Sequence, residues 1–204
     1  QLKTKKKAQE ELVFENKQLT EQNKKYEQAF QEAEHLLEKD PNNVRHQTAY
    51  ANQCVAIGRF EEAIGIYEHV TPKVPDPAQV HLLKGHALKT IDQSELAIAA
   101  YRDAYGARSS FGDAYWSLAN LKTYRFDATE VDQMLGFVGS DAVPSIDQIH
   151  LNFALGKHFE DQQDFEQSFQ FYKTGNAIKQ SAIGFDSELL SNRLKQQHTV
   201  CHHK

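Results

Sequence analysis

The chain has few of the residues that mark secreted, fibrous or membrane proteins. Its 204 residues include two cysteines, five prolines and ten glycines. The two cysteines lie far apart in sequence and form neither a disulfide framework nor a zinc site by spacing. Few glycines and prolines argue against a collagen-like or turn-dense all-β chain. The longest apolar runs span only a few residues, too few for a membrane-spanning helix. We therefore expect a cytoplasmic protein with no membrane partner.

The charge gives no sign of a nucleic-acid partner. The net charge is −5 at neutral pH, so the protein as a whole has no field that attracts nucleic acid or an anionic membrane. The N-terminal stretch QLKTKKKAQEE is rich in lysine, but no aromatic or arginine residues interleave with it, which is typical of a solvated helix end. It begins with Gln and no apolar core follows the lysines, so we expect an internal start rather than a secretory signal.

A period of 34 residues organises the chain. Small residues recur where two helices would cross closely, an aromatic follows one turn later, and proline ends the second helix, with Pro41 and Pro75 in the same phase. The recurrence joins three pairs of residues at this spacing: Ala63 with Ala97, Ile64 with Ile98, and Tyr67 with Tyr101. This is the pattern of tetratricopeptide repeats, in which each unit is a pair of antiparallel helices.

The phase predicts an all-α fold, a right-handed superhelix of tetratricopeptide repeats with a C-terminal capping helix. A partial repeat over 1–43 contributes a helix over 10–38 after a polar start, fraying before about Leu12. The first two helix pairs are predicted at 44–57 with 60–73 and 78–91 with 94–107. A third begins near Asp113 with an atypical second helix, and the last spans 149–162 and 165–179 after an insertion at 139–148. The predicted boundaries are 44–77, 78–111, 112–148 and 149–180 for the repeats, and 181–204 for the capping helix and tail.

Three segments are more particular than a repeat consensus: YWSLANLKTYRF (115–126), HLNFALGKHFEDQQDFEQSFQFYKTGNAI (150–178) and LLKGHALKTIDQSELAIAAYRDA. They resemble the last repeats of bacterial proteins in which a tetratricopeptide array precedes a sulfotransferase domain. The resemblance runs from about Asp40 to Lys179. It implies a parent protein whose following domain binds 3′-phosphoadenosine 5′-phosphosulfate. This chain has no glycine-rich phosphate loop between a strand and a helix, so we expect no cofactor, no catalytic residue and no enzymatic activity within it.

Tetratricopeptide arrays bind ligands through a concave face formed mostly by the first helix of each pair. Asn52, His86, Asn120 and Lys157 share one register and would form a polar ladder able to pair with a peptide backbone. Alternatively, these residues are simply solvated, and Trp116 packs against a neighbouring repeat or domain. The face lacks the dense Lys/Arg set that would bind a C-terminal carboxylate. The predicted groove consists of Arg45, Thr48, Asn52, Gln79, Leu82, His86, Lys89, Trp116, Asn120, Thr123, Phe153 and Lys157.

Other candidate chemistry has simpler explanations. The C-terminal cluster of His198, Cys201, His202 and His203 has no carboxylate nearby, so we expect no functional metal site. The carboxylate pairs Glu61–Glu62 and Asp161/Asp164 fall at helix turns, where carboxylates stabilise helix N-termini. Cys54 occupies a packing position and is expected to be an inert buried thiol.

These observations favour a protein-interaction module with a protein or peptide ligand, possessing no activity of its own. Two alternatives remain open. In the first, the array positions the protein acceptor of a sulfotransferase domain that follows residue 204 in the parent polypeptide. In the second, the repeats mediate self-association through their terminal faces.

Overall fold

The fold was obtained as a computed structural model, which describes the backbone of residues 2–182 and the side chains of residues 12–182. This part of the chain is built from α-helices and one short 3-10 helix, and it contains no strand, which confirms the all-α prediction. None of its helices combines the length and the apolar character that a membrane span needs. The chain divides into two compact units, with the boundary between Arg108 and Ser109 in the sequence, and each is described by itself.

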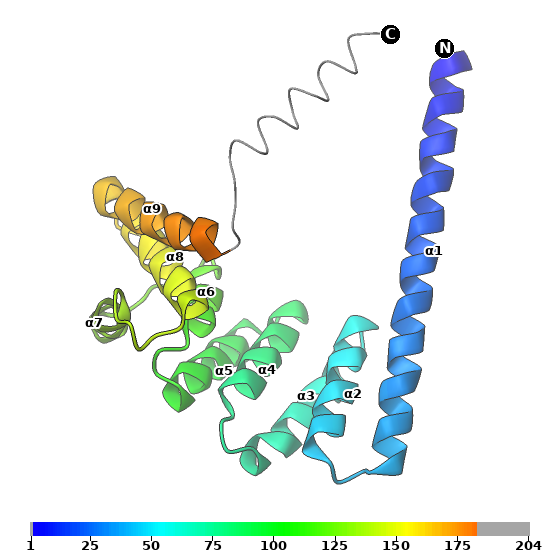
Figure 1. Cartoon of the computed structure of the whole chain (residues 1–204), viewed down its shortest axis with the longest axis horizontal. Coiled ribbons are helices and arrows are strands. Elements are labelled where there is room, and N and C mark those ends of the chain that lie inside the picture. Colours follow the sequence, from blue (N-terminus) through cyan, green and yellow to red (C-terminus); the bar gives the residue numbers. More distant parts are fainter. Residues whose placement is uncertain (1, 183–204) are drawn as a thin grey trace. The chain divides into compact units, whose positions relative to one another are not determined.

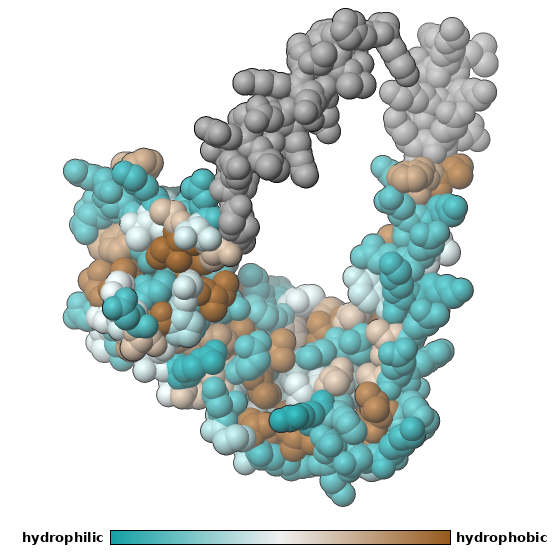
Figure 2. All heavy atoms as spheres, viewed as in Figure 1, coloured by the Kyte–Doolittle hydropathy of each residue, from teal (hydrophilic) through white to brown (hydrophobic). Residues whose placement is uncertain are grey.

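The first unit opens with α1 (Leu2–Lys39), a single uninterrupted helix (Figure 1). The sequence predicted a polar helical start followed by a helix over 10–38, and the structure has no break between them. Only the C-terminal part of α1 contributes to the core, through Ala33, Phe30 and Leu37. The side chains from residue 12 to residue 28 are all exposed. Figure 2 shows hydrophilic residues over most of this helix.

Four helices follow α1 as two antiparallel pairs, each packed on the one before (Figure 1). They are α2 (Val44–Ala56) with α3 (Phe60–Val70), and α4 (Ala78–Thr90) with α5 (Ser94–Ala107); the 3-10 helix η1 (Thr71–Lys73) follows α3. These bounds lie close to the predicted pairs. The side chain of Asn43 caps α2 by accepting hydrogen bonds from the backbone of Arg45 and His46. Gly58 ends the same helix with φ of 85°, a left-handed conformation that glycine adopts without strain.

The second unit contains α6 (Gly112–Ala119), α7 (Ala128–Phe137), α8 (Ser145–Asp161) and α9 (Phe165–Ala182). Its last two helices form a long antiparallel pair, and α6 and α7 both pack on α8 (Figure 1). The prediction for α8 was four residues too short at its start, because the helix begins at Ser145 and not at residue 149. The insertion is correspondingly confined to the loop between Phe137 and Ser145.

The crossing of α6 and α8 is unusually close. A Cβ atom on Gly112 would lie 2.3 Å from the carbonyl oxygen of Asp147, so only glycine fits there. The backbone N–H of Gly112 donates to a carboxylate oxygen of the same Asp147 across 2.9 Å. The N-terminus of α6 is therefore anchored directly on α8. The predicted capping helix and tail lie outside the described residues, apart from the end of α9.

Candidate functional site

The first helices of the two pairs in the first unit carry most of the predicted groove residues in that unit. Five of these side chains are exposed along α2 and α4, and we call them the ladder surface: Arg45, Asn52, Gln79, His86 and Lys89. Thr48 is half-buried, and its hydroxyl donates to the carbonyl oxygen of Val44. The prediction for Leu82 was wrong, because this side chain is 1% exposed and belongs to the core of the unit.

Two residues of the ladder surface are held by tyrosines from the second helix of their own pair. The hydroxyl of Tyr67 on α3 donates to Oδ1 of Asn52 on α2 across 2.7 Å. One repeat later, the hydroxyl of Tyr101 on α5 lies 3.0 Å from Nδ1 of His86 on α4. Both tyrosine rings are buried, so each hydroxyl reaches from the core to the ladder surface. The sequence identified these tyrosines only as residues that fill space between helices.

The small residues of the period make room for these tyrosines. A Cβ atom on Gly85 would lie 2.5 Å from Cε1 of Tyr101, so the ring of Tyr101 packs directly on the backbone of α4. Ala51 holds the same position in the repeat before, and it shares the core with Tyr67. Burial raises the pKa of Tyr67 to about 12. Its hydroxyl therefore stays protonated at neutral pH and can donate to Asn52.

The ladder does not continue into the third predicted repeat. Because α6 ends at Ala119, Asn120 is the residue that caps it, and its Nδ2 donates to the carbonyl oxygen of Trp116 across 2.9 Å. Thr123 lies in the turn that follows, so its assignment to a helical register was wrong. Position 135, where the repeat would place the tyrosine, is Leu135.

In the second unit, the aromatic members of the predicted groove pack against one another. The ring of Phe153 lies 5.6 Å from that of Trp116 and 6.3 Å from that of Tyr172, measured between centroids. Both Trp116 and Phe153 are half-buried. This supports the packing alternative for Trp116 within its own unit.

Lys157, the fourth member of the predicted ladder, is engaged with carboxylates. Its Nζ lies 2.6 Å from Asp161 and 3.3 Å from Glu160. Hydrogen bonding to Asp161 raises the pKa of the ammonium above its usual value. Arg125 also pairs with Asp161 across 3.3 Å. Lys157 is therefore paired with carboxylates of its own helix.

The segment LKTYRF, which contributed to the sulfotransferase resemblance, has packing roles in this structure. The hydroxyl of Tyr124 donates to Glu130, whose other carboxylate oxygen accepts from the backbone of Asp127 in a capping box at the start of α7. The ring of Phe126 lies edge-on to His158 with centroids 6.3 Å apart. The segment thus joins the end of α6 to α7 and α8.

The carboxylate pairs at helix turns also have structural partners. Glu62 accepts from the hydroxyl of Tyr50 and pairs with Arg59. Asp164 accepts from the backbone and the side chain of Gln167 at the start of α9. Cys54 is a buried free thiol as predicted, and burial raises its pKa.

Among the side chains that the structure describes, those of residues 12–182, no cluster could hold a metal ion. The histidines and the cysteine near the C-terminus lie outside these residues.

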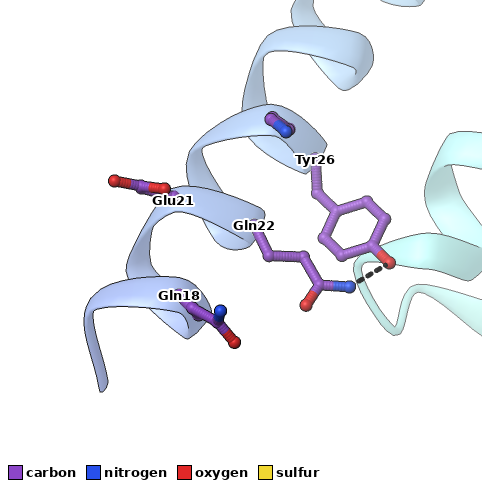
Figure 3. A pocket seen from close by; sticks show the side chains of 5 residues that line it. Gln18, Glu21, Gln22 and Tyr26 are labelled. Atoms are coloured by element: carbon purple, nitrogen blue, oxygen red, sulfur yellow. Dashed lines mark hydrogen bonds between the residues drawn. The ribbon is translucent and has the colours of Figure 1, made fainter. Parts of the chain in front are cut away.

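Three hollows are among those open to solvent in the described part of the chain. The described lining of the first comes from α1 alone, where the side-chain amide of Gln22 donates to the hydroxyl of Tyr26 (Figure 3). The second, mostly apolar, lies between Leu37, Pro41 and α3. The third lies between the loop after α7 and the last turns of α9.

Comparison with known proteins supports the repeat fold. The family model described as a tetratricopeptide repeat matches residues 21–87, from the middle of α1 to the end region of α4. No curated protein matches the chain. The resemblance to arrays that precede sulfotransferase domains therefore stays a prediction.

Solved structures titled as MamA are similar to this chain in fold. "Crystal structure of MamA" is 18% identical, with a TM-score of 0.55, over 81% of this chain and 95% of that one. "MamA RS-1 ArsTM double mutant" is 16% identical, with a TM-score of 0.53, over 82% and 93%. "MamA 41-end from Desulfovibrio magneticus RS-1" is 17% identical, with a TM-score of 0.53, over 76% and 86%. At these identities the likeness concerns the fold, an all-α solenoid.

Proposed function

We propose that this chain is a protein-binding scaffold and that the ladder surface of the first unit receives an extended segment of the partner. The observation that carries the proposal is the repeated pairing of a buried tyrosine with an exposed polar side chain, Tyr67 with Asn52 and Tyr101 with His86. A polar side chain that is already oriented loses less conformational entropy when it binds a ligand.

A site-specific cross-linking experiment tests this proposal. A photo-reactive residue at Gln79, exposed on α4, is compared with one at Glu95, exposed on α5. We expect adducts in lysate of the native host from the Gln79 position, and we expect them to disappear when Asn52→Ala is added. Equal adducts from both positions, or adducts that are indifferent to Asn52→Ala, would contradict binding at the ladder surface.

The sulfotransferase resemblance extends the proposal to the parent protein, where the array would be the acceptor-positioning arm of an enzyme. Its support is the sequence of 115–126 and 150–178. The coding sequence beyond Lys204 tests it, together with calorimetric binding of 3′-phosphoadenosine 5′-phosphosulfate to the longer protein. A downstream phosphate loop with binding would support this role. A stop codon shortly after Lys204 would contradict it and leave the scaffold proposal intact.

A further inference from the structure

Charge in the first unit is segregated between the first and second helices of each pair. Neither α2 nor α4 contains an aspartate or a glutamate, and their charged residues are Arg45, Lys84 and Lys89. The second helices have the opposite net charge: α3 has three glutamates and no lysine or arginine, and α5 has Glu95 and Asp103 against Arg102. The protein is acidic overall, with a net charge of −5. The helices that form the ladder surface are therefore the cationic part of an acidic chain.

Two carboxylates of α3 already pair with cations other than Arg45 and Lys89. Glu68 lies 3.8 Å from Lys84, and Glu62 lies 3.5 Å from Arg59. Among the residues that the structure describes, neither Arg45 nor Lys89 has a carboxylate partner, and both side chains are exposed. On α2 and α4, the helices without carboxylates, Arg45 and Lys89 are therefore the cations available to a ligand.

Because of the hydrogen bond from Tyr67, Asn52 offers a ligand a hydrogen-bond donor, as Arg45 and Lys89 do. An asparagine amide carries both an acceptor and a donor group. The acceptor, Oδ1, already receives the hydroxyl of Tyr67 across 2.7 Å. Oδ1 keeps one lone pair, whereas the Nδ2 amide has both of its N–H donors left for a ligand. Tyr67 is therefore a positioning residue that sets which end of Asn52 is offered.

We propose that the ladder surface selects an acidic, extended peptide segment, with side-chain carboxylates near Arg45 and Lys89 and an oxygen acceptor on Asn52 Nδ2. This inference rests on the proposed function and names the class of partner. The net negative charge of the chain does not oppose it, because charges separated by more than about 8 Å are largely screened at physiological salt. The ligand is an internal segment, since two separated cations provide no clamp for one terminal carboxylate.

The test uses the full chain and three short amidated peptides that carry an N-terminal fluorophore. One alternates Glu with Ser, and in the others Gln or Lys replaces Glu. Fluorescence anisotropy reports binding at low and at physiological salt. Asn52→Asp keeps an acceptor for the Tyr67 hydroxyl but replaces the donor with a carboxylate oxygen. The matched control is Asn176→Asp, the same substitution at an exposed position on α9 in the other unit.

We expect the Glu peptide to bind more tightly than the Gln peptide and the Lys peptide to bind most weakly. Asn52→Asp should weaken the Glu peptide about tenfold or more, because a donor to a charged group is lost and repulsion is added. Combining Arg45→Ala with Lys89→Ala should weaken binding and flatten its salt dependence, whereas Asn176→Asp should bind as the unaltered chain does. Tyr67→Phe should also weaken binding, and Asn52→Ala should remove that effect of Tyr67→Phe.

Equal affinity for the Glu and Gln peptides, or no binding of any peptide, would overturn the inference. Binding of the Glu peptide that is unchanged by Asn52→Asp would also overturn it. The proposed function fails separately, since it depends on the cross-link at Gln79. If a Gln or Lys peptide binds best and Asn52→Asp changes its affinity, the ladder surface remains a binding site but an acidic partner is excluded.

Discussion

The hydroxyl of Tyr67 donates to Oδ1 of Asn52 across 2.7 Å, connecting a core residue of α3 with an exposed residue of α2. Tyr67 is 1% exposed, so it belongs to the core, while its hydroxyl is hydrogen-bonded to a side chain of the surface. The Tyr101–His86 pair repeats this relation in the following repeat. In each pair, the tyrosine therefore both packs between the two helices and orients the exposed side chain, Asn52 or His86, on the first helix.

Removing the Tyr67 hydroxyl should cost a modest amount of stability, because the ring stays in place. We expect Tyr67→Phe to lower the free energy of unfolding of the first unit by about 1 kcal/mol, the usual net value of one hydrogen bond. Native-state hydrogen exchange of α2 and α3 measures this change. The control is Tyr26→Phe, whose hydroxyl accepts from Gln22 on the exposed face of α1. Equal protection in α2 and α3 for both variants would contradict the prediction.

Glycine 85 should tolerate alanine poorly despite lying inside a helix. Alanine normally stabilises a helix interior by about 1 kcal/mol over glycine. At Gly85 the added Cβ would lie 2.5 Å from the ring of Tyr101, so the ring or the helix must move. We expect Gly85→Ala to destabilise the first unit by about 1–3 kcal/mol, as overpacking usually does.

The matched control is Gly65→Ala on α3, where a Cβ would meet nothing within 4 Å. This substitution should stabilise the unit by about 0.5–1 kcal/mol. Urea unfolding followed by far-ultraviolet circular dichroism measures both variants. If both substitutions change the free energy of unfolding in the same direction, Tyr101 does not pack on the backbone of α4 as described.

The sequence predicted the first unit well because its period reflects packing. Ala51, Gly85 and the tyrosines recur at fixed spacing since each pair of helices must cross at the same distance. The partner of a hydroxyl does not follow from such a pattern. Asn52 and Tyr67 are 15 residues apart in sequence, and only the crossing of α2 and α3 brings Oδ1 to the ring's hydroxyl.

The errors arose where tertiary contacts override local pattern. Residues 120–126 continue an apolar, helix-compatible stretch, yet α6 ends at Ala119. Tyr124 binds Glu130 and Phe126 packs on His158, contacts that an extended α6 could not make. Leu82 was placed on the exposed face by counting from a repeat boundary. Its side chain is 1% exposed, because α4 is buried on more than one side.

His158 should make the second unit less stable in mild acid. Burial beside Phe126 and Phe159 lowers the pKa of this imidazole below its ordinary value, and the nearby Asp161 only partly opposes the shift. The folded state therefore favours the neutral ring. Its contribution is fully present above the unfolded pKa of about 6.5 and is lost as the pH falls below that value, because the unfolded chain binds the proton more readily.

Urea unfolding monitored through Trp116 in the same unit measures this dependence between neutral pH and about pH 5. We expect the free energy of unfolding to decrease as the pH falls, and the decrease should be smaller in His158→Phe, which cannot take up the proton. An identical pH dependence in both proteins would assign the acid sensitivity to other groups.

Asn52 and Asn120 should differ in function although the period places them at equivalent positions. The side chain of Asn52 is exposed on the ladder surface, whereas Nδ2 of Asn120 satisfies the carbonyl oxygen of Trp116 at the end of α6. Helix ends leave such carbonyls without intrahelical partners, and losing one side-chain hydrogen bond costs about 0.5–1.5 kcal/mol. Asn120→Ala should therefore lower the stability of the second unit, read from Trp116 fluorescence, and leave binding of the Glu peptide unchanged. Asn52→Ala should weaken that binding. If Asn120→Ala weakens peptide binding as strongly as Asn52→Ala does, the polar ladder continues into the third repeat and the role of Asn120 as a cap alone is wrong.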